Sequence, residues 1–300
     1  MIEYTSENIT AAAIDQMSTT KDERLKTIME SAVRHLHAFA REVNLTPSEW
    51  IFGIQFLTRV GHMCSPARQE FILLSDTLGL STLVNTLHDA TALETATHTS
   101  LLGPFFRENA PHFERGAQIG SDTSSGEVVL WGRVTNIDGK PLANAMVTVW
   151  QTAADGTYDM QHDPNKSDYR GSFVTAADGS YVLRTVKPLG YYIPMDGPVG
   201  DMIRAQGRHG MRPGHIHFLI GAVGYRELVT ALYLANDPHL HDDVVFGASG
   251  DLVAHVKQND PDCPIKGLPS IRFDFSLSRE TAADKAGGRV GADPAAVLAK

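Results

Sequence analysis

The sequence predicts an α+β protein in which a helical N-terminal domain is followed by a C-terminal β-sandwich. Apolar residues recur with helical periodicity through the first hundred positions. From residue 127 onward, short runs rich in Val, Ile, Tyr and Phe alternate with turn signals. We expect residues 1–105 to form the helical domain and a linker helix, 106–126 a linker, 127–278 the sandwich and 279–300 a poorly ordered tail.

Four helices are expected in the N-terminal domain. The first covers residues 23–43, where the apolar side chains share one face. The second begins at the capping box TPSE, residues 46–49, which has Pro at the first helical position, and runs to about residue 64. A third follows Pro66 in the stretch RQEFILLSDTLG, and a fourth covers about 81–88.

Many short strands are expected in the C-terminal domain. Turn signals separate them at Asp138-Gly139, Asp155-Gly156 and Asp178-Gly179. Strands at this spacing are typical of a β-sandwich rather than of βαβ units. The expected strands are VVLWGRVTN, AMVTVWQT, GSFVTA, SYVLRTV, HIHFLIGAV, ELVTALYLA, DLVAHV and IRFDFSL.

Composition excludes several classes of protein. The chain has 300 residues and a net charge of −9, and its Lys and Arg residues form no cluster, which argues against nucleic-acid binding. Its two cysteines, Cys64 and Cys263, are too few for a disulfide framework or a Cys-based zinc site. No signal peptide or apolar run of membrane-spanning length is recognisable, so a cytoplasmic location and no membrane span are expected.

Three His-x-His triplets are the candidate metal ligands. His35 and His37 fall in the strongest helical pattern, where residues two apart point in different directions and cannot easily share an ion. His239-Leu240-His241 lies in a polar segment expected to be a loop.

The triplet His215-Ile216-His217 begins a clear strand. There, residues two apart point to the same face at a spacing of about 7 Å, which lets two imidazoles converge on one cation. A pair of core or surface histidines is the alternative interpretation.

The position of the two histidines does not decide which other residues would bind the metal. A ferrous site with two histidines and one carboxylate would need an inward-facing acid, and Glu227 or Asp237 is available. A ferric site would instead deprotonate phenols and hold them as phenolates, because the ion is hard and highly charged. The upstream segment supplies several candidate phenols: Tyr158, Tyr169, Tyr181, Tyr191 and Tyr192.

Several motifs together resemble one known family. They are DGTY (155–158), LGYY (189–192), GRHGMRPGHIHF (207–218), LLGPFF (101–106), IPMDGPVG (193–200) and the helical stretches RHLHAF, EWIFGIQFLTRVG and RQEFILLSDTLG. The chain resembles the intradiol ring-cleaving dioxygenases, and within them most closely the hydroxyquinol 1,2-dioxygenase group. These are non-haem Fe(III) enzymes with two Tyr and two His ligands, and the resemblance extends over most of the chain.

The resemblance implies a role for each matching residue. Tyr158 and His215 would be equatorial ligands of Fe(III), and Tyr191 and His217 axial ones. Tyr191 would leave the metal when substrate binds and accept a substrate proton, while Arg212 would stabilise negative charge on the substrate ring. The expected pocket residues are Leu74, Asp76, Leu101, Leu102, Gly103, Pro104, Phe105, Ile193, Pro194, Arg212 and Val245.

The resemblance also implies the reaction and the partners. The expected substrates are an aromatic diol or triol and O2, with benzene-1,2,4-triol cleaved to 3-hydroxy-cis,cis-muconate, the tautomer of maleylacetate. Catechol or chlorocatechol is the alternative substrate, and a non-enzymatic β-sandwich binding module is a remote alternative. The helical domain would form a homodimer, and bound phospholipid is a further expectation. One departure is Ala231, which stands where many catechol-cleaving relatives have Gln.

Overall fold

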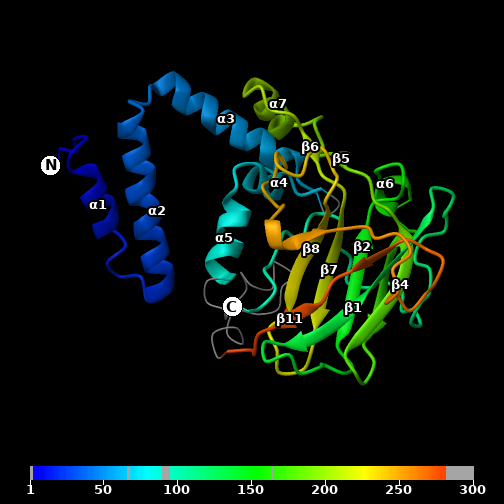
Figure 1. The fold of residues 1–300 in the computed structure, drawn as a ribbon. Helices are drawn as coiled ribbons and strands as arrows, with labels where there is room; N and C mark the ends of the chain where they lie inside the picture. Colours follow the sequence, from blue (N-terminus) through cyan, green and yellow to red (C-terminus); the bar gives the residue numbers. More distant parts are fainter. Residues whose placement is uncertain (1–2, 66–67, 90–94, 164, 282–300) are drawn as a thin grey trace. The chain divides into compact units, whose positions relative to one another are not determined.

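The structure is a computed structural model that describes residues 3–65, 68–89, 95–163 and 165–281 (Figure 1). It divides into two compact units, Met1–His62 and Met63–Lys300. Helices make up the first unit, and a β-sandwich with short helices makes up the second, so the predicted α+β class is confirmed. Most of the expected tail lies outside the described residues.

The first unit contains the helices α1 (Ile9–Asp15), α2 (Glu23–Glu42) and α3 (Pro47–Met63). Its predicted capping box is present, because Thr46 N donates to Glu49 Oε2 at 2.9 Å and Glu49 N donates to Thr46 Oγ1 at 3.3 Å. Within the described residues, no helix is both long enough and apolar enough to cross a bilayer.

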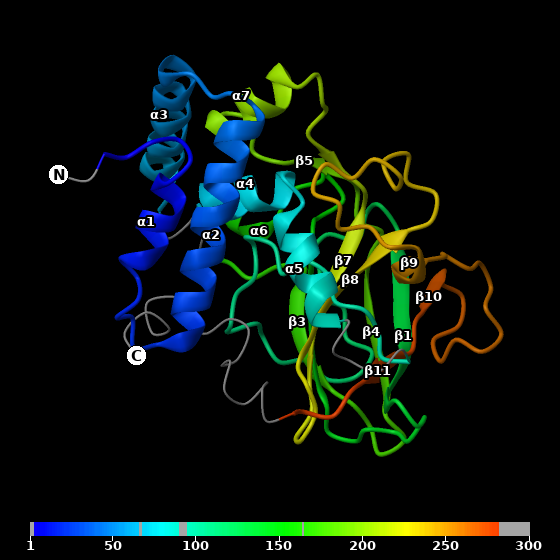
Figure 2. The ribbon, with the colours of Figure 1, turned by 90° about the vertical axis from the view of Figure 1, so that its left-hand side faces the viewer.

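The helices α4 (Glu70–Thr77) and α5 (Leu80–Asp89) belong to the second unit (Figure 2). Helical periodicity alone groups them with the preceding helices, in the expected helical domain of residues 1–105. Both helices bond to other parts of the second unit: Val199 N donates to Glu70 Oε1 of α4 at 3.2 Å, and Thr82 Oγ1 of α5 donates to Val245 O at 3.2 Å. These long-range bonds are invisible to helical periodicity.

Two sheets form the sandwich. In the first, β1 pairs with β4 on one side and with β10 and β11 on the other. The second runs in the order β3-β2-β7-β8-β9. The strands of the first sheet are β1 (Glu127–Asn136), β4 (Ser180–Val186), β10 (Ser270–Arg272) and β11 (Phe275–Leu277). Those of the second are β2 (Met146–Gln151), β3 (Arg170–Val174), β7 (His215–Gly221), β8 (Leu228–Leu234) and β9 (Val253–Ala254).

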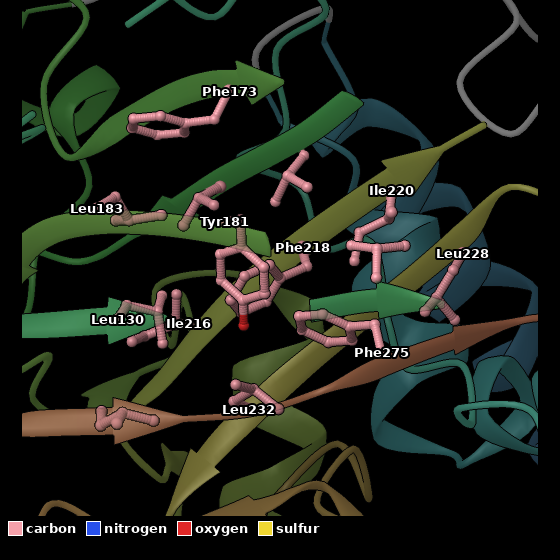
Figure 3. Close-up of a cluster of buried hydrophobic side chains, with 14 of the residues drawn as sticks. Leu130, Phe173, Tyr181, Leu183, Ile216, Phe218, Ile220, Leu228, Leu232 and Phe275 are labelled. Atoms are coloured by element: carbon pink, nitrogen blue, oxygen red, sulfur yellow. The ribbon is translucent and has the colours of Figure 1, made fainter. Parts of the chain in front are cut away.

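The hydrophobic core fills the space between the two sheets (Figure 3). Strand β7 contributes Ile216, Phe218 and Ile220 to it, all fully buried. Since side chains alternate between the faces of a strand, His215 and His217 lie on the opposite face of the same sheet.

Several short elements lie outside the two sheets. They are β5 (Tyr191–Tyr192), β6 (Met211–Arg212), α6 (Asp159–His162), α7 (Pro198–Ala205) and the 3-10 helix η1 (Gly250–Leu252). Strands β5 and β6 pair in antiparallel fashion, and this pairing sets Tyr191 opposite Arg212. These elements therefore bring residues from distant parts of the sequence to the face that holds the two histidines.

Candidate metal centre

Four side chains converge on the outer face of β7. His215 Nε2 is 3.1 Å from His217 Nε2 and 3.4 Å from Tyr158 Oη. The Tyr191 ring lies 5.5 Å from the Tyr158 ring and 5.7 Å from the His215 ring, between centroids. All four are buried, with exposed fractions between 0% and 9%. The two triplet histidines and two of the candidate tyrosines thus share one site.

Turns position the two tyrosines. Asp155 Oδ1 accepts from Thr157 N at 2.9 Å, which tightens the Asp-Gly turn just before Tyr158. Gly190 precedes Tyr191 at a close backbone approach, where a Cβ would lie 2.5 Å from Arg212 O. Only glycine fits there, so the Gly-Tyr step lets the Tyr191 segment pack against the segment that leads into β7.

A buried ion pair anchors the segment after Tyr158. Arg170 Nε donates to Asp159 Oδ2 at 2.6 Å, and Arg170 Nη1 donates to Phe105 O at 3.1 Å. Burial raises the pKa of Asp159, but Arg170 and backbone N–H groups outweigh it and hold the pKa below its ordinary value. The pair joins α6 to the 101–106 turn, whose Phe105 ring stacks on Tyr158 with centroids 4.2 Å apart.

The phenol of Tyr158 is suited to a cation. Burial raises its pKa well above the ordinary value, and the neighbouring Tyr191 raises it further. A phenolate at this position therefore requires a bound cation to stabilise it. The adjacent tyrosines 191 and 192 are distinguished by burial: Tyr191 is 9% exposed and faces the site, whereas Tyr192 is 66% exposed.

Both histidines are neutral. Burial lowers their pKa values well below the ordinary value, and the positive charge of Arg212 lowers them further. His215 Nδ1 lies 2.7 Å from Pro213 O, which can only accept, so its proton is on Nδ1 and the Nε2 lone pair faces the site. His217 is held by stacking on Trp150, with centroids 4.9 Å apart and planes 4° apart. Neutral imidazoles with converging Nε2 atoms are what a metal ion requires.

Arg212 places a buried cation beside this cluster. Its Nη1 is 3.4 Å from Tyr191 Oη and 3.2 Å from His215 Nε2. Its other side pairs with Asp243, and both side chains are nearly fully buried. The Arg212 charge, which is expected beside the substrate, therefore lies within hydrogen-bonding distance of two of the four candidate ligands.

The carboxylates of the ferrous alternative make other contacts, although Glu227 lines a cavity together with Asp76 and Gly103. Asp237 uses Oδ2 to accept from Gly214 N at 2.8 Å and Oδ1 to accept from His239 N at 2.9 Å. The Glu227 carboxylate lies near Gly221, at the far end of β7, where its Oε2 is 3.9 Å from the position of a Cβ on that glycine. Neither acid joins the histidines, which favours the two-tyrosine set.

The other two triplets are not part of the site. His35 and His37 lie on helix α2, as expected, and His37 Nδ1 is 3.0 Å from Thr10 Oγ1. His241 is exposed, while His239 Nδ1 is 3.1 Å from Asp242 Oδ1.

His239, His209 and Asp242 form a half-exposed cluster with donor atoms within 4.8 Å of one another. Met211 N donates to His209 Nδ1 at 3.1 Å, so the neutral ring holds its proton on Nε2, which points at Asp242 Oδ2 at 3.0 Å. Hydrogen bonding accounts for this cluster without a metal.

Some of the predicted pocket residues line one cavity, and several others differ in their burial. A cavity of about 230 Å³ is lined by Asp76 and by Leu101, Leu102 and Gly103 of the turn, among others. A Cβ added at Gly103 would come within 3.4 Å of His217 Nε2. Leu74, Ile193 and Val245 are buried, Pro194 is half-buried and Pro104 is exposed. Their contacts with substrate stay predictions.

Two further buried residues, Tyr233 and Asp243, accept hydrogen bonds from Arg212. Tyr233 stands opposite His215 in the β7–β8 pairing, and Ala231 stands opposite His217. Tyr233 is two residues from Ala231 on the same strand, so both side chains point to the same face. This spacing could have predicted from the sequence that Tyr233 lies on that face. Asp243, 31 residues from Arg212, gives no such signal.

The sequence matches two protein-family models. One, described as "Dioxygenase", matches residues 101–279, and the other, "Catechol dioxygenase N terminus", matches residues 22–95. The chain belongs to the intradiol dioxygenase family. It is therefore an enzyme of the ring-cleaving class, and the binding-module alternative is not supported.

Individual relatives of this dioxygenase are similar over nearly their whole length. It is 44% identical to the 6-chlorohydroxyquinol 1,2-dioxygenase of Cupriavidus pinatubonensis, over 93% of this chain and 99% of the relative. It is 38% identical to the hydroxyquinol 1,2-dioxygenase of Nocardioides simplex, over 91% and 95%. The solved structure of hydroxyquinol 1,2-dioxygenase from Pseudomonas putida DLL-E4 superposes with a TM-score of 0.85 at 41% identity, over 92% and 99%.

The ligand set predicts how metal content responds to substitution. His217→Ala removes one donor, so metal affinity should fall by more than the roughly 10–100-fold that follows loss of an outer-shell partner. Glu227→Gln and His35→Ala should keep the wild-type content, measured by elemental analysis after dialysis. Metal loss in Glu227→Gln would support the site with two histidines and one carboxylate instead, and full metal content in His217→Ala would remove His217 from the ligand set.

Proposed function

We propose that this dioxygenase is a non-haem Fe(III) enzyme that cleaves hydroxyquinol, benzene-1,2,4-triol, between its two adjacent hydroxyls. The observation that supports the metal is the convergence of two buried tyrosines and two neutral histidines on one point. The substrate is supported by the hydroxyquinol and chlorohydroxyquinol dioxygenases to which the chain is similar.

Tyr158, Tyr191, His215 and His217 would hold the ferric ion. A hard trivalent cation favours phenolate oxygen, and two phenolates with two imidazoles leave a net charge near +1 that suits a dianionic diol. When bound, the ion would draw electron density from the chelated ring and make it reactive toward O2.

Tyr191 and Arg212 are the residues proposed to act on the substrate. Tyr191 Oη would accept the proton of one substrate hydroxyl and a hydroxide ion that of the other, so no separate general base from the protein is needed. Arg212, with Nη1 3.4 Å from Tyr191 Oη, would then face the anionic diol and stabilise charge that develops on the ring. The bond between the two hydroxyl-bearing carbons breaks and both oxygen atoms enter the product, 3-hydroxy-cis,cis-muconate, the tautomer of maleylacetate.

Asp76 is the proposed selectivity residue. It lies on α4, is 6% exposed and lines the cavity beside Leu101 and Gly103. Burial raises the pKa of its carboxyl, and the Ser81 hydroxyl and the charge of Arg212 oppose the rise. A buried carboxyl with spare hydrogen-bonding capacity would favour a ring with a third hydroxyl over catechol or chlorocatechol, which are the alternative substrates.

A pair of substrates tests this selectivity. Asp76→Ala should lower kcat/KM for hydroxyquinol at least about ten-fold more than for catechol, because only the triol loses a hydrogen bond in the pocket. Steady-state oxygen uptake on both substrates, with thermal unfolding as a check of folding, gives the ratio. Equal loss on both would remove Asp76 from the selectivity role.

Visible absorbance tests the ferric–tyrosinate assignment. The purified enzyme should be red-brown from tyrosinate-to-Fe(III) charge transfer, and Tyr158→Phe and Tyr191→Phe should each shift or weaken the band. Tyr192→Phe is the matched control, because its ring is 66% exposed and lies outside the site. Colourless protein with full iron occupancy would falsify the assignment.

We also propose a homodimer formed by the helical unit, with phospholipid as a further ligand of its apolar faces. Large apolar side chains of α2 and α3 are between 43% and 65% exposed in the single chain. Many exposed large apolar side chains on two helices are typical of a subunit or lipid interface. The residues are Leu25, Ile28, Met29, Leu36, Phe39, Trp50, Ile51, Phe52, Ile54 and Leu57.

Sedimentation tests the dimer. Leu36→Glu and Phe39→Glu place charge on α2 where the side chains are 65% and 54% exposed, so they should shift the protein from dimer to monomer. His35→Ala, on the same exposed stretch, should stay dimeric. Mass spectrometry of a solvent extract reports bound phospholipid, and a monomeric wild type would contradict the dimer.

A further inference from the structure

A buried ion pair lies behind the candidate metal ligands. Arg212 Nε donates to Asp243 Oδ1 at 3.2 Å, and Arg212 Nη2 donates to Asp243 Oδ2 at 3.3 Å. The remaining nitrogen, Nη1, points the opposite way, toward Tyr191 Oη and His215 Nε2. A guanidinium is a rigid planar fork, so a carboxylate that binds one edge fixes the direction of the other.

Asp243 is itself held in place by backbone groups. Its Oδ1 accepts from Val245 N at 3.3 Å and its Oδ2 accepts from Gly247 N at 3.0 Å. The same loop is fixed from outside, because Arg208 Nη2 donates to Val244 O at 2.8 Å. The carboxylate therefore has a defined orientation that does not depend on Arg212.

Tyr233 gives the guanidinium a second, uncharged support. Arg212 Nη2 donates to Tyr233 Oη at 3.3 Å, which lies 2.8 Å from Ser100 Oγ, and Ser100 Oγ donates to Gly247 O at 3.3 Å. Burial raises the pKa of Tyr233 to about 12, so the phenol stays neutral and Asp243 is the charged partner of Arg212. A Cβ at Gly247 would lie 2.6 Å from Tyr233 Oη, which leaves room only for glycine in this network.

We propose that Asp243 is a positioning residue for ring cleavage, which holds the Arg212 guanidinium with Nη1 toward the substrate, while Tyr233 steadies the same group. The proposal rests on the proposed role of Arg212. Arginine has several rotatable bonds, and an anionic substrate would draw an untethered guanidinium to whichever oxygen lies nearest. A tethered one is preorganised for the charge that develops during the reaction.

Asp243→Asn and its neighbour Asp242→Asn form a matched pair. Asp242 is exposed and its side chain contacts His209 and His239. Asp243→Asn should lower kcat for hydroxyquinol about 10–100-fold while KM changes by less than about three-fold, since transition-state stabilisation is lost. Asp242→Asn should keep both constants. Unchanged kcat in Asp243→Asn would overturn the proposal.

A double-variant cycle separates positioning from a general structural effect. If Asp243 acts through Arg212, then Asp243→Asn should change kcat by less than about two-fold in an Arg212→Gln background. Losses that multiply would show that Asp243 acts independently and would contradict the proposal. The double variant replaces both charges, so it keeps a neutral pair where Asp243→Asn alone leaves a buried cation without its counterion.

Readouts other than activity keep this test independent of the proposed function. Crystal structures of wild type and Asp243→Asn report the direction of Arg212 directly, and an unmoved guanidinium in the variant would overturn the proposal. Iron content and thermal unfolding show whether the ligand site is intact. If the wild-type enzyme failed to cleave hydroxyquinol, the proposed function would fall, while the orientation of Arg212 would still be decided by these structures.

Discussion

The alternation of side chains between the two faces of β7 is the constraint on which the sandwich unit depends. Ile216, Phe218 and Ile220 point between the two sheets, and burial of each such side chain contributes about 1.5–3 kcal/mol. His215 and His217 must then share the other face, where their Nε2 atoms lie 3.1 Å apart. A register slip of one residue would move the imidazoles into the core and the apolar side chains into the site. The core that stabilises the fold therefore also aligns the two candidate metal-binding histidines.

The outer face of β7 holds one buried cation, Arg212, and donor groups that suit a second, the ferric ion. Burial keeps the imidazoles neutral and raises the pKa of Tyr158, so the site without metal holds uncharged donors beside the buried Arg212 cation. Asp243 balances that cation. A ferric ion would convert the phenols to phenolates, and the site would then hold alternating charges at short range, which is favourable only because water is largely excluded.

Sequence periodicity predicted the parts of this arrangement that are local. A spacing of two residues on a strand selected His215 and His217 as candidate metal ligands, and helical periodicity argued against His35 and His37. The capping box predicted the first residue of α3 correctly. The choice of Tyr158 and Tyr191 came from the family resemblance, and the structure brings both to the histidines.

Contacts between residues far apart in the chain could not be predicted from the sequence. The short helix α1 has too few residues for a periodic signal. Helices α4 and α5 belong to the same unit as the sandwich, and bonds such as Thr82 Oγ1 to Val245 O, between residues far apart in the sequence, are encoded by no local pattern. Asp243 reaches Arg212 across 31 residues and a loop, so its role emerges only in three dimensions.

The identity of the ring-cleavage product tests the central claim most directly. Iron-loaded enzyme with benzene-1,2,4-triol and O2 should consume one O2 per triol and give 3-hydroxy-cis,cis-muconate or its tautomer maleylacetate, identified by mass spectrometry and NMR. A semialdehyde product, from cleavage beside the hydroxyls rather than between them, would contradict the assignment of this site as an intradiol ferric centre.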